Sequence, residues 1–277
     1  MKKILKITAV TFVSVYMLFC VMVLMFPQMF FYHPSSRPSV LKNAHTYDYP
    51  AHEVKYVSAD GTQLHAWYTA PAGKDKIIVF MHGNAHNIEE FYYKLKSFML
   101  DGYGTFMPEY RGFGGLKGKI NQKNLEADAL AAVRFLNKHG YKNENIFLYG
   151  MSLGSHMAVH TAYELQKEGA FAGIILEVPF DSLVNTAKKR APYFPFDLLI
   201  RDKFDNTQEI TALKSPILIM GAERDETVPV ELAKNLYEVA PANKKMIIYK
   251  NAEHRNLYNY RNDLDILNWI GLNEKGI

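Results

Sequence analysis

The chain has 277 residues and a formal net charge of +4, and 48% of its residues are hydrophobic against 22% charged. These proportions are close to the globular average. They exclude a disordered chain and a polytopic membrane protein, and the length suits one large α/β domain or two small ones. Because Lys2, Lys3 and Lys6 supply three of the positive charges, the rest of the chain carries only +1 and offers no basic surface for nucleic acid. The single cysteine, Cys20, excludes an intrachain disulfide framework and a CxxC redox site.

The N-terminal segment is apolar enough to anchor the chain in a membrane. The uncharged run from Ile7 to Phe26 matches a hydrocarbon core about 30 Å thick when each helical residue adds about 1.5 Å. A cleaved signal peptide has a shorter apolar region that ends at small residues. Here the bulky Phe30, Phe31 and Tyr32 follow, which suit an aromatic belt at the membrane interface. We therefore expect residues 1–32 to hold an uncleaved anchor that crosses the membrane with residues 7–26.

The charges on either side of the anchor predict its orientation. Lys2, Lys3 and Lys6 precede the apolar run, whereas Arg37 and Lys42 follow it. The more positive flank of a membrane-spanning helix usually stays in the cytoplasm. We therefore expect a single-pass protein with a cytoplasmic N-terminus and its main domain outside the cytoplasm.

A linker and a hairpin are predicted next. Residues 33–52 contain three prolines and are expected to form an extended linker to a domain over residues 53–277. Within that domain, Glu53 to Val57 and Leu64 to Tyr68 flank Asp60-Gly61, a pattern typical of a β-hairpin.

An alternation of short apolar runs and helical patterns fills the rest of the domain. Short runs that are apolar at every position predict a mostly parallel sheet buried on both faces by helices, which is an α/β fold. The runs are Ile77 to Met81, Gly104 to Met107, Ile146 to Tyr149, Gly173 to Leu176, Pro216 to Met220 and Lys245 to Tyr249.

Helices are expected between these strands, and one segment breaks the rhythm. Helical spacing covers Glu89 to Leu100, a stretch around residues 125–136, and about Ser152 to Lys167. Residues 180–215 are rich in proline and aromatic residues, and we expect a helix followed by a small helical cap. The aromatic residues Tyr193, Phe194 and Phe196 could line an acyl pocket or fill the core of the cap.

The sequence Gly150-Met151-Ser152-Leu153-Gly154 has the form G-x-S-x-G. It directly follows an apolar strand and precedes a helix, which is the setting of a nucleophile elbow. In such an elbow the serine hydroxyl projects from a strained turn, and side chains in place of the glycines would collide with neighbouring backbone. The alternative is a serine N-cap between closely packed glycines.

A nucleophilic serine needs a base and an acid that orients the base. His254 follows the last predicted strand, and Asp225 follows the one before it, so both lie at the carboxyl edge of the sheet. This is the chain order serine, acid, histidine. Other carboxylates compete with Asp225 for the role of the acid, namely Glu223, Glu226, Glu177 and Asp181.

The loop after the first parallel strand, His82-Gly83-Asn84-Ala85-His86, is expected to complete an oxyanion hole. The N–H of Asn84 would pair with that of Leu153 around one oxygen, and Gly83 would allow a sharp turn. His82 is expected to hold this loop by hydrogen bonds, while His86 could line the pocket or face water.

Two further groups have structural explanations. The run Tyr110-Arg111-Gly112-Phe113-Gly114-Gly115 lacks the ending of a P-loop and the spacing of a dinucleotide turn, so we interpret it as a turn that braces the site. The basic triplet at 188–190 could meet acidic lipid headgroups or form a solvated helix end.

Taken together, these pieces resemble the α/β-hydrolase family, and within it the serine aminopeptidase-type branch that includes membrane-anchored hydrolases. The resemblance covers about residue 30 to the C-terminus. The matching pieces are Ala59-Asp60-Gly61-Thr62, His82-Gly83-Asn84, Tyr110 to Gly114, Gly150 to Gly154, Asp225 to Pro229, and His254.

The resemblance implies a serine nucleophile, a covalent acyl-enzyme and no metal or cofactor. Relatives act as lipid esterases, lysophospholipases, protein thioesterases and peptidases, so an ester or thioester substrate is expected. A peptidase would need acidic groups for a free amine, and Glu177 and Asp181 are candidates. An inactive hydrolase fold that serves as a membrane-bound binding module is the remaining alternative.

Overall fold

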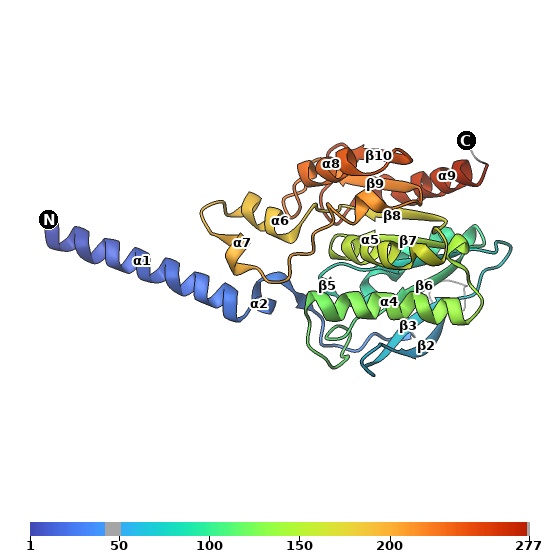
Figure 1. Ribbon diagram of the computed structural model, residues 1–277, viewed down its shortest axis with the longest axis horizontal. Coiled ribbons are helices and arrows are strands. Elements are labelled where there is room, and N and C mark those ends of the chain that lie inside the picture. The colour runs from blue at the N-terminus through green and yellow to red at the C-terminus, as the bar shows by residue number, and fades with distance from the viewer. Residues whose placement is uncertain (42–50, 276–277) are drawn as a thin grey trace.

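The computed structural model describes residues 1–41 and 51–275, and an eight-stranded sheet forms its centre (Figure 1). The strand order is β10-β9-β8-β7-β4-β6-β3-β2. The strands from β6 to β10 in this order run parallel, whereas β3 pairs antiparallel with both β2 and β6, so the predicted α/β fold is confirmed. The strands are β2 (His52–Val57), β3 (Gln63–Thr69), β4 (Ile77–Met81), β6 (Gly104–Pro108), β7 (Ile146–Met151), β8 (Gly173–Glu177), β9 (Ile217–Ala222) and β10 (Lys244–Tyr249).

Helices cover both faces of this sheet (Figure 1). On one face α4 (Gln122–Lys138), α5 (Leu153–Leu165) and α8 (Val230–Val239) bury their apolar side chains. On the other face lie the 3₁₀ helix η2 (Ile88–Leu95), α3 (Lys96–Leu100) and α9 (Asn262–Glu274). Short 3₁₀ turns complete the connections: η3 (Asn143–Asn145), η4 (Gln166–Glu168) and η6 (Leu257–Tyr260).

Strand β4 explains why the predicted strands are apolar at every position. Its side chains alternate between the two cores, with Ile77, Val79 and Met81 in one core and Ile78 and Phe80 in the other. All five are fully buried. Burial of each such side chain contributes about 1.5–3 kcal/mol, so a polar residue at any of these positions would weaken the sheet.

The helix expected from Glu89 to Leu100 begins differently from the prediction. Residues Ile88–Leu95 form a 3₁₀ helix, and only Lys96–Leu100 are α-helical. Tertiary contacts hold both ends of the 3₁₀ part. The N–H of Ile88 donates to the carboxylate of Glu109 at 3.1 Å, and the buried Lys94 pairs with Glu177 at 2.8 Å. Spacing along the chain contains no information about these contacts.

The N-terminal helix α1 (Lys2–Met25) extends away from the domain (Figure 1) and is long and apolar enough to cross a membrane. The short α2 (Gln28–Phe31) follows it, and then β1 (His33–Pro34), which pairs with β5 (Ala85–His86). The predicted linker therefore needs correction, because its first part is bound to the domain. Ser39 likewise donates to the buried Glu109 at 2.6 Å, while residues 42–50 of the expected linker lie outside the described residues.

The interrupting segment forms a small cap that packs against the anchor. It contains α6 (Leu183–Arg190), α7 (Phe196–Leu199) and η5 (Ile210–Ala212), and α7 lies beside α1 (Figure 1). Phe194 stacks on Tyr16 with ring centroids 5.0 Å apart, and Phe196 belongs to one buried cluster with Cys20. Tyr193 is 86% exposed. These aromatic residues thus form the contact between cap and anchor or face outward, and they do not line the cavity next to Ser152.

Candidate active site

Ser152 occupies a strained turn between β7 and α5. Its φ of +53° is in the region that side chains other than glycine rarely adopt. Both flanking glycines are required by space, because a Cβ at Gly150 would overlap the carbonyl of Gly154, and a Cβ at Gly154 would overlap the carbonyl of Met81. The Ser152 N–H donates to Glu177 O at 2.9 Å and so fixes the turn to β8.

The structure brings Ser152, His254 and Asp225 into one hydrogen-bonded chain. His254 Nε2 lies 3.1 Å from Ser152 Oγ, and its Nδ1 lies 2.7 Å from Asp225 Oδ2. The other oxygen of Asp225 accepts from the N–H groups of Thr227 at 2.8 Å and Val228 at 2.7 Å. Because Asp225 accepts at both oxygens, it can orient the imidazole and leave Nε2 directed at the hydroxyl.

The competing carboxylates are engaged elsewhere or exposed. Glu223 accepts from the N–H of Asn251, and Glu226 is exposed. Glu177 is buried beneath the turn, where it pairs with Lys94 and accepts from the Tyr149 hydroxyl. Asp181 accepts from the side-chain amide of Asn235 at 3.0 Å. The geometry therefore favours Asp225 as the partner of His254.

A cavity of about 340 Å³ opens beside Ser152. Its lining includes Asn84 and Leu153, the two residues predicted to form the oxyanion hole. Leu153 is the first residue of α5, so its N–H has no acceptor within the helix. Most other lining residues are apolar, the described lining contains no carboxylate, and Arg190 supplies a positive charge. They are Phe30, Phe31, Tyr32, His33, Phe180, Leu183, Thr186, Ala187, Arg190, Thr227 and Val228.

The loop that carries Asn84 is attached to the end of the anchor. The side-chain amide of Asn84 donates to Phe31 O at 2.9 Å, and its carbonyl accepts from the N–H of His33 at 2.8 Å. Gly83, which is expected to allow a sharp turn, has no positive φ, and a Cβ there would make only ordinary contacts at 3.5 Å. The two hydrogen bonds to residues 31 and 33 hold this loop against the N-terminal segment.

The two histidines of this loop differ in their surroundings. His82 is fully buried, with Nδ1 2.8 Å from Gly83 O and Nε2 3.1 Å from a Glu109 oxygen, which agrees with a role in holding the loop. His86 lies outside the cavity lining, and its Nε2 is 2.5 Å from a guanidinium nitrogen of Arg255. Partial burial, together with the charge of Arg255, lowers the pKa of His86, so the ring is neutral and accepts from the guanidinium.

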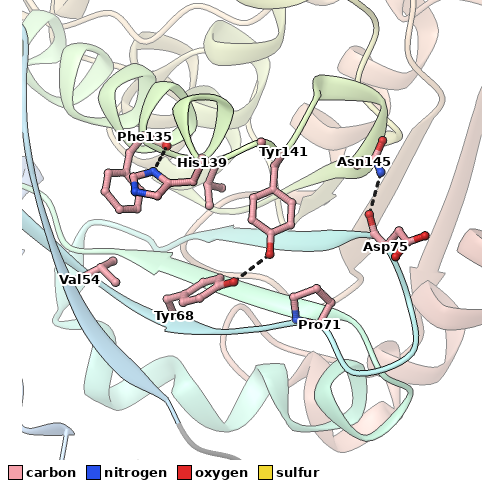
Figure 2. A pocket seen from close by; sticks show the side chains of 10 residues that line it. Val54, Tyr68, Pro71, Asp75, Phe135, His139, Tyr141 and Asn145 are labelled. Carbon is pink, nitrogen blue, oxygen red and sulfur yellow. Dashed lines mark hydrogen bonds between the residues drawn. The ribbon is translucent and has the colours of Figure 1, made fainter.

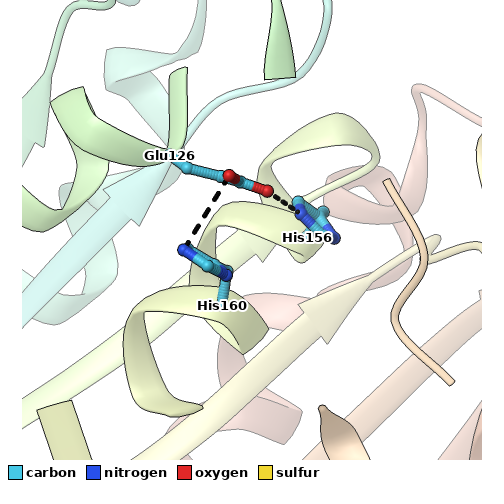
Figure 3. Close-up of side chains that lie close together, drawn as sticks. All are labelled: Glu126, His156 and His160. Atoms are coloured by element: carbon cyan, nitrogen blue, oxygen red, sulfur yellow. Dashed lines mark hydrogen bonds and ion pairs between the residues drawn. The ribbon is translucent and has the colours of Figure 1, made fainter. Parts of the chain in front are cut away.

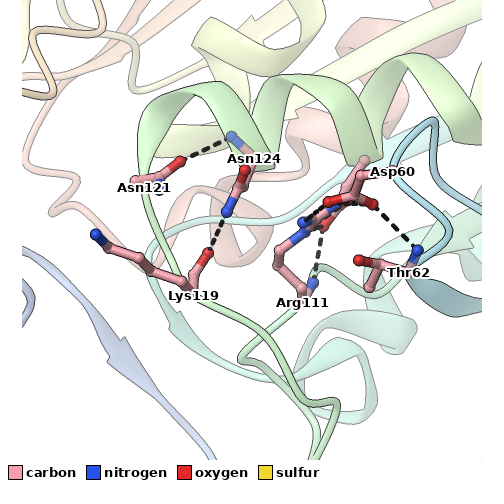
Figure 4. A network of polar contacts seen from close by, with 7 residues as sticks. Asp60, Thr62, Arg111, Lys119, Asn121 and Asn124 are labelled. Carbon is pink, nitrogen blue, oxygen red and sulfur yellow. Dashed lines mark hydrogen bonds and ion pairs between the residues drawn. The ribbon is translucent and has the colours of Figure 1, made fainter.

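The glycine-rich turn after β6 is braced by ion pairs (Figure 4). Arg111 contacts Asp128 at 2.6 Å and Asp60 at 2.5 Å. Hydrogen bonds from Arg111 and Thr62 hold the pKa of Asp60 well below its usual range. With its guanidinium bound to two carboxylates, Arg111 has a structural role, which agrees with the interpretation of this run as a bracing turn.

A larger hollow of about 590 Å³ lies at the opposite ends of the strands (Figure 2). Tyr68 and Tyr141 share a hydrogen bond of 2.8 Å across it, and Asn145 donates to Asp75 O. Asp75 lies two residues before β4 and Asn145 directly before β7, so this hollow opens at the amino ends of the parallel strands. Ligand sites in open α/β sheets form at the carboxyl ends, where Ser152 lies.

Comparison with known proteins places the chain in a family. The model of the family "Serine aminopeptidase, S33", an α/β-hydrolase family, matches residues 72–193, and human Protein ABHD12B is 32% identical over 238 residues that cover 71% of this chain and 66% of that protein. The chain belongs to the α/β-hydrolase family. This confirms the resemblance drawn from the sequence motifs.

A named lipase and a solved esterase structure are also similar to this α/β-hydrolase. Lysophosphatidylserine lipase ABHD12 of Macaca fascicularis is 31% identical over 195 residues, covering 63% of this chain and 48% of the lipase, so the chain spans about half the length of that relative. Among solved structures, the Pyrococcus furiosus esterase Pf2001 aligns with a TM-score of 0.70 at 20% identity, covering 88% of this chain and 97% of the esterase. That likeness shows the fold.

Some lining residues of the α/β-hydrolase site were not predicted as such. The sequence predicts only a membrane-interface belt for Phe30 to Tyr32, yet their side chains form one wall of the cavity. It predicts a solvated or lipid-facing triplet that includes Arg190, yet this residue lines the cavity from the end of α6. Their proximity to Ser152 depends on how the anchor and cap fold back onto the domain, which no local pattern encodes.

Proposed function

We propose that this chain is a membrane-anchored serine hydrolase that cleaves carboxylic ester bonds, with thioesters as the nearest alternative, through an acyl-enzyme on Ser152. The observation that carries the proposal is the hydrogen-bonded chain from Ser152 through His254 to Asp225, at the wall of an apolar cavity. Nucleophile, base and orienting acid in this geometry are the parts that acyl transfer requires.

The proposed reaction has two halves. His254 Nε2 accepts the proton of Ser152 as Oγ attacks the acyl carbonyl, and Asp225 stabilises the imidazolium. The N–H groups of Asn84 and Leu153 donate to the oxyanion. The leaving group then departs with the proton from His254. In the second half, water attacks the acyl-enzyme with His254 as the base, and the carboxylic acid is released.

The charges of the cavity support an ester substrate over a peptide with a free amine. An aminopeptidase needs a carboxylate near the substrate's amine, whereas the described lining contains none. Glu177, one candidate for that role, is buried and paired with Lys94, and Asp181 is bonded to Asn235. The positive charge of Arg190 instead suits an anionic group on the substrate.

The position of the cavity next to the anchor supports a lipid substrate. Phe30 and Phe31 line the cavity and lie only a few residues after the predicted span of 7–26. Together with Arg190, this favours a single-chain anionic lipid ester, which agrees with the similarity to lipases named for lysophosphatidylserine. We further propose that the N-terminus is cytoplasmic and the domain lies outside the cytoplasm.

A fluorophosphonate probe tests the proposed nucleophile. Full-length protein in detergent should be labelled covalently, and Ser152→Ala should abolish labelling and lower p-nitrophenyl ester turnover by roughly 10⁴ or more. Ser155→Ala, which changes the neighbouring buried hydroxyl of α5, is the matched control and should still be labelled. Labelling that persists in Ser152→Ala would contradict the proposal.

Substitutions in the cap test whether the protein contacts a lipid surface during hydrolysis. Tyr193 and Leu198 are 86% and 79% exposed and belong to the segment that contacts α1, so we expect them to meet lipid. Replacing both by serine should lower hydrolysis of vesicle-borne lysophospholipid several-fold and leave turnover of short soluble esters unchanged. Leu272→Ser on α9, at a 41% exposed position away from the cap, is the control. Equal loss on both substrates would contradict membrane contact.

A further inference from the structure

A second cluster of histidine and glutamate side chains lies outside the proposed mechanism. Glu126 comes from α4, and His156 and His160 come from α5 (Figure 3). One ligand atom of each lies within 4.8 Å of the others. His156 Nε2 is 2.9 Å from Glu126 Oε1, and His160 Nε2 is 3.9 Å from Glu126 Oε2. None of the three lines the cavity beside Ser152.

Helix geometry directs the two imidazoles to the same place. His156 and His160 are four residues apart on α5, so their side chains project from one face of the helix. Their rings are nearly parallel, with an interplanar angle of 15° and centroids 5.9 Å apart. A pair of histidines at this spacing on a helix is a common way to supply two metal ligands, and a third comes here from the neighbouring helix.

Hydrogen bonds fix which nitrogen of His156 faces the cluster. The side-chain amide of Asn206 donates to Phe180 O at 2.8 Å, so its Oδ1 is the atom that lies 2.9 Å from His156 Nδ1. Because this oxygen only accepts, Nδ1 donates to it, and Nε2 is the nitrogen that lies 2.9 Å from Glu126 Oε1, where a bound ion would replace the proton between the two groups.

His160 is held in the same way by a carboxylate. Its Nδ1 donates to Glu209 Oε1 at 2.9 Å, which leaves Nε2 toward Glu126. Histidines that bind metals almost always donate their other N–H to a carboxylate, carbonyl or similar oxygen, which fixes tautomer and ring orientation. Both histidines thus have the outer hydrogen bond that a metal ligand needs, and both direct Nε2 toward Glu126.

The distances between the ligand atoms suit a small divalent ion. Metal–ligand bonds of about 2.1 Å in tetrahedral geometry separate the ligand atoms by roughly 3.4 Å. The distances of 2.9 Å from His156 Nε2 to Glu126 Oε1 and 3.9 Å from His160 Nε2 to Glu126 Oε2 lie on either side of this value, so each imidazole has one carboxylate oxygen at about the separation that a shared ion requires. The side chains of His160 and Glu126 are 15% and 17% exposed, which leaves a path by which an ion and a water ligand can enter.

We propose that Glu126, His156 and His160 form a binding site for a divalent transition metal, with Zn²⁺ the best fit to two imidazole nitrogens and one carboxylate. A metal ion bound there would stabilise the fold and would take no part in ester cleavage. Asn206 and Glu209, which orient the two histidines, belong to the segment that returns from the cap, so the ion would join α4 and α5 to the base of the cap.

Isothermal titration calorimetry tests the site directly. Untagged full-length protein in detergent, stripped with EDTA and dialysed, should bind one equivalent of ZnCl₂ with micromolar or tighter affinity. His160→Gln and Glu126→Gln, which remove ligands from different helices, should each weaken binding at least tenfold. His139→Gln is the control, because His139 bonds to Phe135 O at the end of α4 and lies outside the cluster, and it should bind as the unmodified protein does.

A cobalt titration gives an independent readout. Co²⁺ at this site should produce the visible absorption of a tetrahedral N/O complex, and the bands should vanish in His160→Gln. Ser152→Ala should bind Zn²⁺ with unchanged affinity, so failure of the proposed hydrolase activity would leave this result standing. No binding by the unmodified protein, or affinity unchanged in both ligand variants, would overturn the site in favour of a plain ion-pair network.

Discussion

The two histidine sites of this molecule share one half of their geometry and differ in the other. His254 has its Nδ1 fixed by Asp225, as His156 has by Asn206 and His160 by Glu209. Across Nε2, however, His254 faces the hydroxyl of Ser152, whereas the other two face the carboxylate of Glu126. A hydroxyl can give up a proton and attack, while a carboxylate holds a cation. The partner across Nε2 therefore decides the chemistry.

The sites also differ in what supports them. Ser152, Asp225 and His254 sit on turns and loops at the carboxyl edge of the sheet, where a substrate can approach. His156 and His160 sit on the rigid face of a helix against another helix. Loops allow reacting groups to meet a variable ligand, whereas adjacent helices suit a small ion with fixed geometry.

The largest expected effect is a loss of ester turnover when a histidine of the Ser152 site is replaced, with little loss at the Glu126 site. His254→Gln removes the proposed base and should lower p-nitrophenyl ester turnover by roughly 10⁴ or more. His160→Gln, a matched substitution at the other site, should lower turnover less than about threefold. Steady-state kinetics on both variants measures the ratio, and equal losses would show that the two histidine sites do not differ in the way we infer.

A second substitution tests how Asp225 orients the imidazole of His254. Asp225→Asn keeps the size of the side chain, but its oxygen would remain on the N–H groups of Thr227 and Val228 and direct the NH₂ toward His254. The imidazole would then carry its proton on Nε2 and could not accept one from Ser152. We expect turnover to fall about 10⁴-fold.

The turnover of Asp225→Asn at high pH tests whether the loss comes from the wrong imidazole tautomer. In Asp225→Asn, hydroxide can replace the missing base, so turnover should rise with pH well above neutrality. The unmodified enzyme keeps its base and should show no such hydroxide-dependent rise. A variant that retains activity near the unmodified level at pH 7 would contradict the tautomer argument.

The smallest effect concerns stability. Zinc at 100 times its dissociation constant should stabilise the native protein by about 2.7 kcal/mol. For a domain of this size each kcal/mol raises Tm by about 2–4 °C, so differential scanning fluorimetry should show a shift of roughly 5–10 °C. His139→Gln should shift equally and Glu126→Gln little. A shift of the same size in Glu126→Gln would assign the stabilisation to another site.

Much of the fold could be predicted because the buried strands have a strong local signal. Apolar runs such as Ile77 to Met81 and Ile146 to Tyr149 match β4 and β7 within two residues. Ser152, Asp225 and His254 could be selected because each follows a strand and their order in the chain is diagnostic. Each of these features can be predicted from the residue pattern of one short segment.

The remaining features depend on contacts between distant segments. The packing of Phe194 on Tyr16 joins the cap to the anchor across more than 170 residues, and the wall formed by Phe30 to Tyr32 is held by hydrogen bonds of residues 31–33 to Asn84 and Asp202. The spacing of His156 and His160 is visible in the sequence, but Glu126 lies thirty residues earlier and has no motif of its own. Only the fold shows that these three side chains converge.

The hydrogen bonds between Asn84 and residues 31 and 33 tie the proposed active site to the N-terminal segment of the chain. A shortened form that begins after residue 32 would remove Phe30 to Tyr32 from the wall of the cavity and break the hydrogen bond between Phe31 and Asn84, the proposed oxyanion donor. The segment that directly follows the candidate membrane helix thus forms part of the proposed active site. Kinetic constants measured on a fragment without residues 1–32 should therefore differ from those of the full chain.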